Sequence, residues 1–138
     1  MRRAFEGTPP SALRIVVVHH PLEHLPGERK KLTRGARSAI RALGKNGTDI
    51  VLSGHLHSWR AGVFAETDEH PAVLQVQAGT GLSNRQRGEP NDFNLLHLQP
   101  DHVRVDRFAV PTGGSGFECL QTARFAQDER GWSSFEPG

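Results

Sequence analysis

Two histidines separated by one residue carry the clearest sign of chemistry in this sequence. His55 and His57 belong to the tetrapeptide Gly-His-Leu-His, which directly follows the apolar run at residues 50–52. Alternate residues of a turn at the end of a strand point into one small volume. Because neutral imidazole nitrogen is a common ligand of zinc, iron and manganese, this pair predicts a metal site.

A second pair of histidines strengthens this interpretation. His19 and His20 come directly after another apolar run, at residues 13–18. Two strands that both end in histidine predict one site at the carboxyl edge of one sheet, where open α/β sheets usually bind their ligands. The alternative is an ordinary polar role: a solvent-exposed turn for His55 and His57, and a hydrogen-bonded strand cap for His19.

The elements that must position these histidines are predicted to form a strand–helix–strand unit. The predicted strands at residues 13–18 and 49–53 contain consecutive apolar residues at 15–18 and 50–52, as in parallel strands buried on both faces. Between them, residues 29–44 carry apolar side chains at helical spacing, and Asn46-Gly47 provides a stop signal. Two parallel strands joined by a helix form a right-handed crossover unit.

After His55 and His57 the pattern changes to short strands separated by turns. Several of these segments alternate apolar with polar residues, as antiparallel strands with one solvated face do. The candidates are residues 60–65, 72–78, 94–99 and 103–110. Residues 118–126 are predicted to form a last strand or a short helix. We therefore expect a flexible arm at residues 1–12, one domain at residues 13–110 and a partly ordered extension at residues 111–138.

A long polar loop at residues 79–91 contains two candidate substrate-binding residues. Arg85 and Arg87 carry guanidinium groups, which pair well with a phosphate or carboxylate on a substrate. A plain surface loop would explain the same residues.

Composition limits the classes of protein to which the chain can belong. The 138 residues include 36% hydrophobic and 23% charged residues, which predicts one globular domain. The formal charge of +2 does not indicate nucleic-acid binding. The single Cys119 cannot form an internal disulfide, which is typical of a reducing compartment, and no apolar run approaches membrane-spanning length. We therefore expect a cytoplasmic protein with no membrane association.

The order of these motifs resembles the calcineurin-like metallophosphoesterases. The shared order is an apolar strand, His-His-Pro-Leu, an amphipathic helix, a second strand and Gly-His-Leu-His, and it is most similar to the bacterial cyclic-nucleotide phosphodiesterase branch. Residues 77–83, continuing through Arg85 and Arg87 to Asn94, resemble the same branch, so the similarity covers about residues 13–110. The resemblance implies an α/β fold: the C-terminal half of a four-layer α/β/β/α sandwich, with one βαβ unit followed by mainly antiparallel strands.

The resemblance also implies roles for the histidines. By position, His19 and His55 match ligands of one metal ion, and His57 matches a ligand of the other. His20 is implied to lie near the substrate phosphate, as a catalytic residue. The family centre holds two divalent ions (manganese, iron or zinc), and a metal-bridging hydroxide attacks the phosphorus of a phosphoester substrate.

Three family signatures that should precede His19 are absent: Asp-x-His, Gly-Asp and Gly-Asn-His-Asp. We therefore expect the remaining ligands of a phosphodiesterase centre to come from a partner chain or from sequence outside this chain. The alternative is a catalytically inactive remnant that acts as a metal-binding or subunit-interaction domain. Such a remnant would associate through the sheet edge left open by the absent strands.

A third class of function would use the basic helix. Its charged residues could dock onto nucleic acid, but the solvated face of an amphipathic helix explains them equally, and we do not expect nucleic acid as a partner. These residues are Lys30, Lys31, Arg34, Arg37, Arg41 and Lys45.

Overall fold

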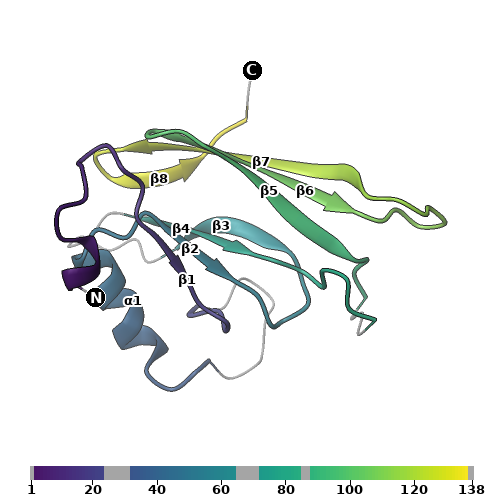
Figure 1. Ribbon diagram of the computed structural model, residues 1–138, viewed down its shortest axis with the longest axis horizontal. Helices are drawn as coiled ribbons and strands as arrows, with labels where there is room; N and C mark the ends of the chain where they lie inside the picture. Colours follow the sequence, from purple (N-terminus) through teal and green to yellow (C-terminus); the bar gives the residue numbers. More distant parts are fainter. Residues whose placement is uncertain (1, 24–31, 65–71, 85–87, 137–138) are drawn as a thin grey trace.

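The computed structural model, which describes residues 2–23, 32–64, 72–84 and 88–136, contains two sheets, and consecutive apolar residues form two strands of the first (Figure 1). The strand order of this first sheet is β1-β2-β4-β3. The strands are β1 (Ile15–Val17), β2 (Ile50–Ser53), β3 (Arg60–Phe64) and β4 (Val73–Gln77). β1 pairs with β2 and β2 with β4 in parallel, whereas β3 pairs with β4 antiparallel. The carboxyl ends of β1 and β2 therefore lie at the same edge.

Alternating residues build the second sheet, whose four strands follow one another in chain order and pair antiparallel. They are β5 (Asp92–Leu98), β6 (His102–Ala109), β7 (Glu118–Asp128) and β8 (Gly131–Ser134). Residues 118–126, which the sequence allows as a strand or a short helix, belong to the strand β7. β8 was not predicted, and it contains one large apolar residue, Trp132, which is 2% exposed in the core.

The helix α1 (Ala36–Lys45) is shorter than predicted. Residues 32–35 are described and are not helical, and residues 29–31 lie outside the described part of the chain. Gly35 has a φ of +85°, which a right-handed helix cannot contain, so the helix starts after it. Asn46 ends the helix by donating its side-chain amide to the Ala42 carbonyl at 2.6 Å. A short 3₁₀ helix, η1 (Arg2–Phe5), precedes β1.

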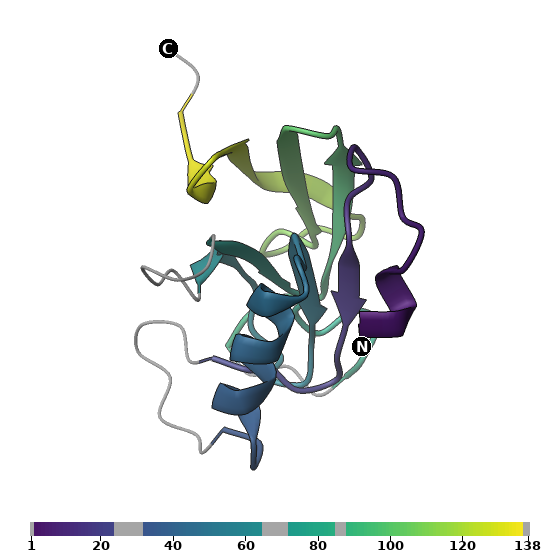
Figure 2. The same ribbon diagram turned by 90° about the vertical axis from the view of Figure 1, so that its left-hand side faces the viewer.

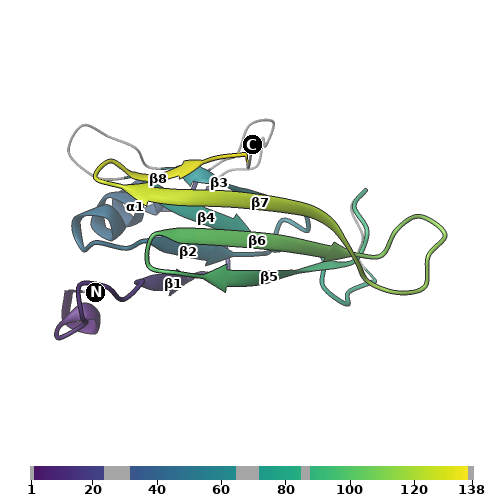
Figure 3. The ribbon, with the colours of Figure 1, turned by 90° about the horizontal axis from the view of Figure 1, so that it is seen from above.

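The elements form three layers, with α1 on one face of the first sheet and the second sheet on the other (Figures 2 and 3). Apolar residues of α1, Ala36 and Leu43, pack against Val51 and Val73 of the first sheet. A second cluster fills the space between the sheets and consists of Ile50, Leu74, Val76, Val103, Val105, Phe125 and Trp132. The predicted fold class is confirmed: an α/β chain with one βαβ unit followed by mainly antiparallel strands.

None of the helices in the described ranges combines the length and the apolar character needed to cross a membrane.

Candidate metal centre

The parallel pairing of β1 and β2 brings two histidine-bearing loops to one sheet edge. β1 ends at Val17 and β2 ends at Ser53, so the residues that follow them leave the sheet side by side. The Gly54 backbone N–H donates to the His19 carbonyl at 3.2 Å and fastens the two loops together.

Three imidazoles meet at this edge. One ring nitrogen from each of His19, His20 and His55 lies within 4.8 Å of the others, and all three side chains are exposed. The shortest separation, 3.1 Å, joins His19 Nε2 and His55 Nδ1. The nitrogens of two histidines on one tetrahedral zinc ion, each roughly 2.0–2.1 Å from the metal, stand about 3.3–3.4 Å apart. The His19–His55 pair therefore has nearly the spacing of two ligands of one divalent cation, His20 would have to move closer to bind the same ion, and the group contains no carboxylate.

His20 belongs to this group, although the resemblance implied a place beside the substrate phosphate. In a strand, neighbouring side chains point to opposite faces, so His19 and His20 would be separated. The strand ends at Val17, and both histidines lie in a bend, which allows the two rings to approach within 4.6 Å of each other. Two adjacent histidines directly after a strand end are the sequence signal for this arrangement.

The turn that carries His55 and His57 has an unusual backbone. Both have positive φ, 70° and 59°, and they are the only non-glycine residues with this conformation in the described ranges. The left-handed region is uncommon for residues with a side chain, and such residues cluster at functional sites. His57 is half-buried and is not part of the three-histidine group, so its role at a second metal ion stays a prediction.

The predicted substrate-binding residues Arg85 and Arg87 lie outside the described residues. Asp49 is at the opposite end of β2, where its carboxylate accepts hydrogen bonds from the Arg14 backbone N–H at 2.7 Å and from Gln127 Nε2 at 3.1 Å.

An ion-pair cluster fixes the chain directly after the histidine turn. Glu89 Oε2 accepts hydrogen bonds from the Trp59 backbone N–H at 3.0 Å and from Arg107 Nη2 at 2.7 Å. Arg107 Nε donates to Asp92 Oδ2 at 2.7 Å, and the Asp92 side chain is fully buried. The Arg107 guanidinium also lies over the Trp59 ring, 5.3 Å from its centre. The second sheet therefore anchors the turn two residues after His57.

Gln77, at the end of β4, supports the same turn from the first sheet. This buried side chain donates to the Ser58 carbonyl at 2.7 Å and contacts the Ser58 hydroxyl at 3.1 Å. Neither support was predicted, because each joins residues far apart in the sequence whose positions depend on strand register.

Comparisons with known proteins give fold-level likeness only. No protein-family model matches the chain, and no curated protein matches it. Vacuolar Protein Sorting 29 from Cryptosporidium parvum is similar at 22% identity with a TM-score of 0.44, over 68% of this chain and 45% of that chain. A single-substitution mutant of Vps29 from Entamoeba histolytica is similar at 16% identity with a TM-score of 0.41, over 75% of this chain and 48% of that chain. The chain thus spans about half the length of the solved structures that it matches.

Proposed function

We propose that this chain supplies the histidine side of a metal-dependent phosphoesterase centre, acting on phosphodiesters, with cyclic nucleotides as candidate substrates. The observation that carries the proposal is the convergence of His19, His20 and His55 from two parallel strand ends. The order of the motifs supports the same class, because it resembles the metallophosphoesterases in sequence. The remaining ligands come from outside this chain.

The donor set fits one divalent cation. Imidazole nitrogens suit zinc, manganese and iron, and three exposed ligands leave a position open to water or a phosphoester oxygen. A cation held there would lower the pKa of a coordinated water and polarise the phosphoester. In this proposal His19 and His55 hold the cation, and His20 either completes the set or faces the phosphate.

The donor set does not fit two cations. Two dications about 4 Å apart repel by roughly 17 kcal/mol at an effective dielectric constant of about 20. Neutral imidazoles contribute no negative charge to offset this repulsion, and the three-histidine group contains no carboxylate. In the complete centre, His57 would bind a second ion, and Arg85 and Arg87 would contact substrate, only together with acidic ligands supplied by another polypeptide segment.

We expect the purified chain to bind one Zn²⁺ with a Kd on the order of 10 μM. His55→Ala is expected to weaken this binding at least tenfold, because loss of even an outer-shell partner of a metal ligand costs roughly 10–100-fold in affinity. Isothermal titration calorimetry measures the affinity, and visible absorption of bound Co²⁺ reports its nitrogen coordination.

His102→Ala is the matched control, since His102 begins β6 in the other sheet and should leave Zn²⁺ affinity unchanged. Equal Zn²⁺ affinities for the wild type and His55→Ala would contradict the proposed metal site. Turnover of bis(p-nitrophenyl) phosphate with added Mn²⁺, lost in His55→Ala, would support catalysis by this chain alone. Metal binding without turnover would support either a partner that completes the centre or a non-catalytic domain.

A second candidate function, a subunit-interaction domain, is favoured by the open edge of β1. β1 is the first strand of its sheet and has only β2 as a neighbour among the described strands. Its last residue, Val17, is 74% exposed. An unpaired strand edge offers backbone donors and acceptors to a strand of another chain, here a partner or a second copy.

Val17→Lys is expected to reduce association through this edge, because charged side chains on an edge strand oppose pairing. Sedimentation velocity at increasing protein concentration measures the association. Leu82→Lys is the control, because Leu82 is 87% exposed and lies outside both sheets. A wild-type chain that stays monomeric over the whole concentration range would rule out self-association through β1.

A further inference from the structure

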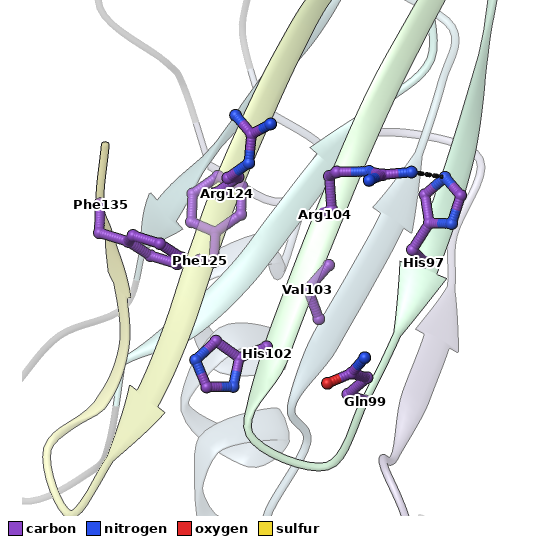
Figure 4. A pocket seen from close by; sticks show the side chains of 8 residues that line it. All are labelled: His97, Gln99, His102, Val103, Arg104, Arg124, Phe125 and Phe135. Atoms are coloured by element: carbon purple, nitrogen blue, oxygen red, sulfur yellow. Dashed lines mark hydrogen bonds between the residues drawn. The ribbon is translucent and has the colours of Figure 1, made fainter. Parts of the chain in front are cut away.

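A cavity of about 360 Å³ lies against the second sheet and shares no residue with the histidine group. Figure 4 shows that two arginines and two imidazoles line it, from three neighbouring strands, and that the ring of Phe135 borders it. Its volume falls in the range of small-molecule sites, roughly 300–1,000 Å³. The histidines of this cavity, His97 and His102, had no role assigned from sequence.

Three of the lining side chains, those of His97, Arg104 and Arg124, form a row across the outer face of the second sheet. Antiparallel pairing places His97 opposite Arg104, and Arg104 opposite Arg124. Val103 and Phe125, the neighbours of the arginines in sequence, are buried in the core between the sheets. Because side chains alternate along a strand, the row faces away from that core.

The two arginines of this row differ in whether a neighbouring side chain pairs with their positive charge. Arg104 Nε lies 3.1 Å from Asp106 Oδ2, and Arg104 Nη2 lies 2.7 Å from His97 Nε2. In the part of the chain that the structure describes, the Arg124 guanidinium has neither an ion pair nor a hydrogen bond. Since like charges directly opposite each other destabilise a sheet, the row carries a positive charge that a bound anion would neutralise.

Asp106 already has two partners in this row: His97 Nε2 lies 2.9 Å and Arg104 Nε 3.1 Å from Asp106 Oδ2. The Thr122 hydroxyl donates to Asp106 Oδ1 at 2.8 Å, and the Asp106 side chain is 11% exposed. Burial raises the pKa of the Asp106 carboxyl, but hydrogen bonds from Thr122 and His97 and the charges of Arg104 and His97 outweigh it, so the pKa is below its usual value. The carboxylate therefore stays ionised at neutral pH beside Arg104, which leaves the charge of Arg124 for a ligand.

An aromatic ring borders the same cavity as Arg124. The Phe135 backbone N–H donates to the Arg124 carbonyl at 3.1 Å, which holds the backbone of Phe135 against β7. The Phe135 ring is 6.0 Å from the His102 ring, nearly perpendicular to it, and its side chain is partly exposed. The carboxylate next to the cavity, Asp101, pairs with the His102 ring at 2.8 Å.

We propose that this cavity binds a small phosphomonoester that carries an aromatic ring, with Arg124 on the phosphate and Phe135 against the ring. The planar donors of a guanidinium match phosphate oxygens in a bidentate geometry. Offset or edge-to-face contact with Phe135 favours a flat ring over an aliphatic group. The proposal does not depend on the metal centre.

Phenyl phosphate is the probe, titrated into the full chain in the presence of EDTA so that metal ions play no part. We expect saturable binding with a Kd on the order of 1 mM, followed by isothermal titration calorimetry or by NMR shifts. Arg124→Gln is expected to weaken binding about tenfold, because a charge-assisted bidentate pair is lost. Phe135→Leu is expected to weaken phenyl phosphate and leave inorganic phosphate unchanged.

Arg37→Gln is the matched control, since Arg37 is exposed on α1 and should leave the affinity unchanged. Thermal unfolding of each variant establishes that the chain is folded, and His55→Ala should bind phenyl phosphate as the wild type does. Absence of saturable binding would overturn the proposal. An affinity that is equal for phenyl phosphate and inorganic phosphate, or unchanged in Arg124→Gln, would also overturn it.

Discussion

Replacing Arg107 with methionine is expected to lower the free energy of unfolding by about 3–5 kcal/mol. The substitution removes the partner of Asp92, whose side chain is fully buried, and so leaves an uncompensated charge in the interior. It also frees Glu89 from its shortest ion pair, 2.7 Å, and removes the cation over the Trp59 ring. Urea denaturation followed by tryptophan fluorescence and circular dichroism measures the loss.

Arg60→Met is the matched control for Arg107→Met. Arg60 also pairs with Glu89, at 3.3 Å, but its side chain is 48% exposed, and a solvated ion pair contributes at most about 1 kcal/mol. Equal losses in the two variants would contradict the argument, because they would mean that burial of Asp92 does not set the size of the effect. Zn²⁺ affinity in Arg107→Met would report whether the cluster also positions the histidine turn.

Gly131→Ala is expected to destabilise the protein by about 3 kcal/mol or more, from backbone strain together with overpacking. Gly131 has a φ of +100°, and a Cβ there would lie 2.4 Å from both the backbone nitrogen and the carbonyl oxygen of Ala72. A backbone neighbour cannot rotate away, so the two segments must separate. That movement would break the hydrogen bond from the Trp132 N–H to the Ala72 carbonyl, 3.2 Å, where β8 meets the first sheet.

The control for Gly131→Ala is Gly116→Ala, in the loop before β7. A Cβ at Gly116 meets nothing within 4 Å, and its φ is not in the left-handed region. Its replacement should change the free energy of unfolding by no more than about 1 kcal/mol, in the stabilising direction. Identical urea midpoints for the two variants would show that the close approach of Gly131 to Ala72 does not constrain the fold.

The sheets follow from patterns that are visible in the sequence. Consecutive apolar residues mark β1 and β2, which are parallel, and alternation marks β6. The alternation in β4 was wrong as a sign of a solvated face, because β4 lies between β2 and β3, is parallel to β2 and is buried at every position, Gln75 and Gln77 included. The start of α1 was wrong by several residues, because apolar spacing extends upstream past Gly35, where the backbone turns left-handed. β8 was missed because four residues with one large apolar side chain carry no periodicity.

The proximity of His19 to His55 could also be predicted from sequence, because β1 and β2 are adjacent parallel strands whose carboxyl ends lie at one edge of the sheet. The supports around it could not be predicted in this way. Arg107 reaches Asp92 across 15 positions and Glu89 across 18, and the bulge between Arg107 and Phe108 shifts the register of β6 against β7. The row from His97 to Arg124 likewise exists only once the alignment of three strands is known.

The left-handed backbone at His55 and His57 restricts which amino acids these two positions accept. Besides glycine, asparagine and aspartate adopt this conformation most readily, whereas β-branched residues are strongly disfavoured. Amino-acid substitutions at these positions are therefore tolerated best when they introduce an amide or a carboxylate, whose oxygens are harder donors than imidazole nitrogen. A single codon change at either position would therefore replace an imidazole with an oxygen donor at this sheet edge without a rearrangement of the loop.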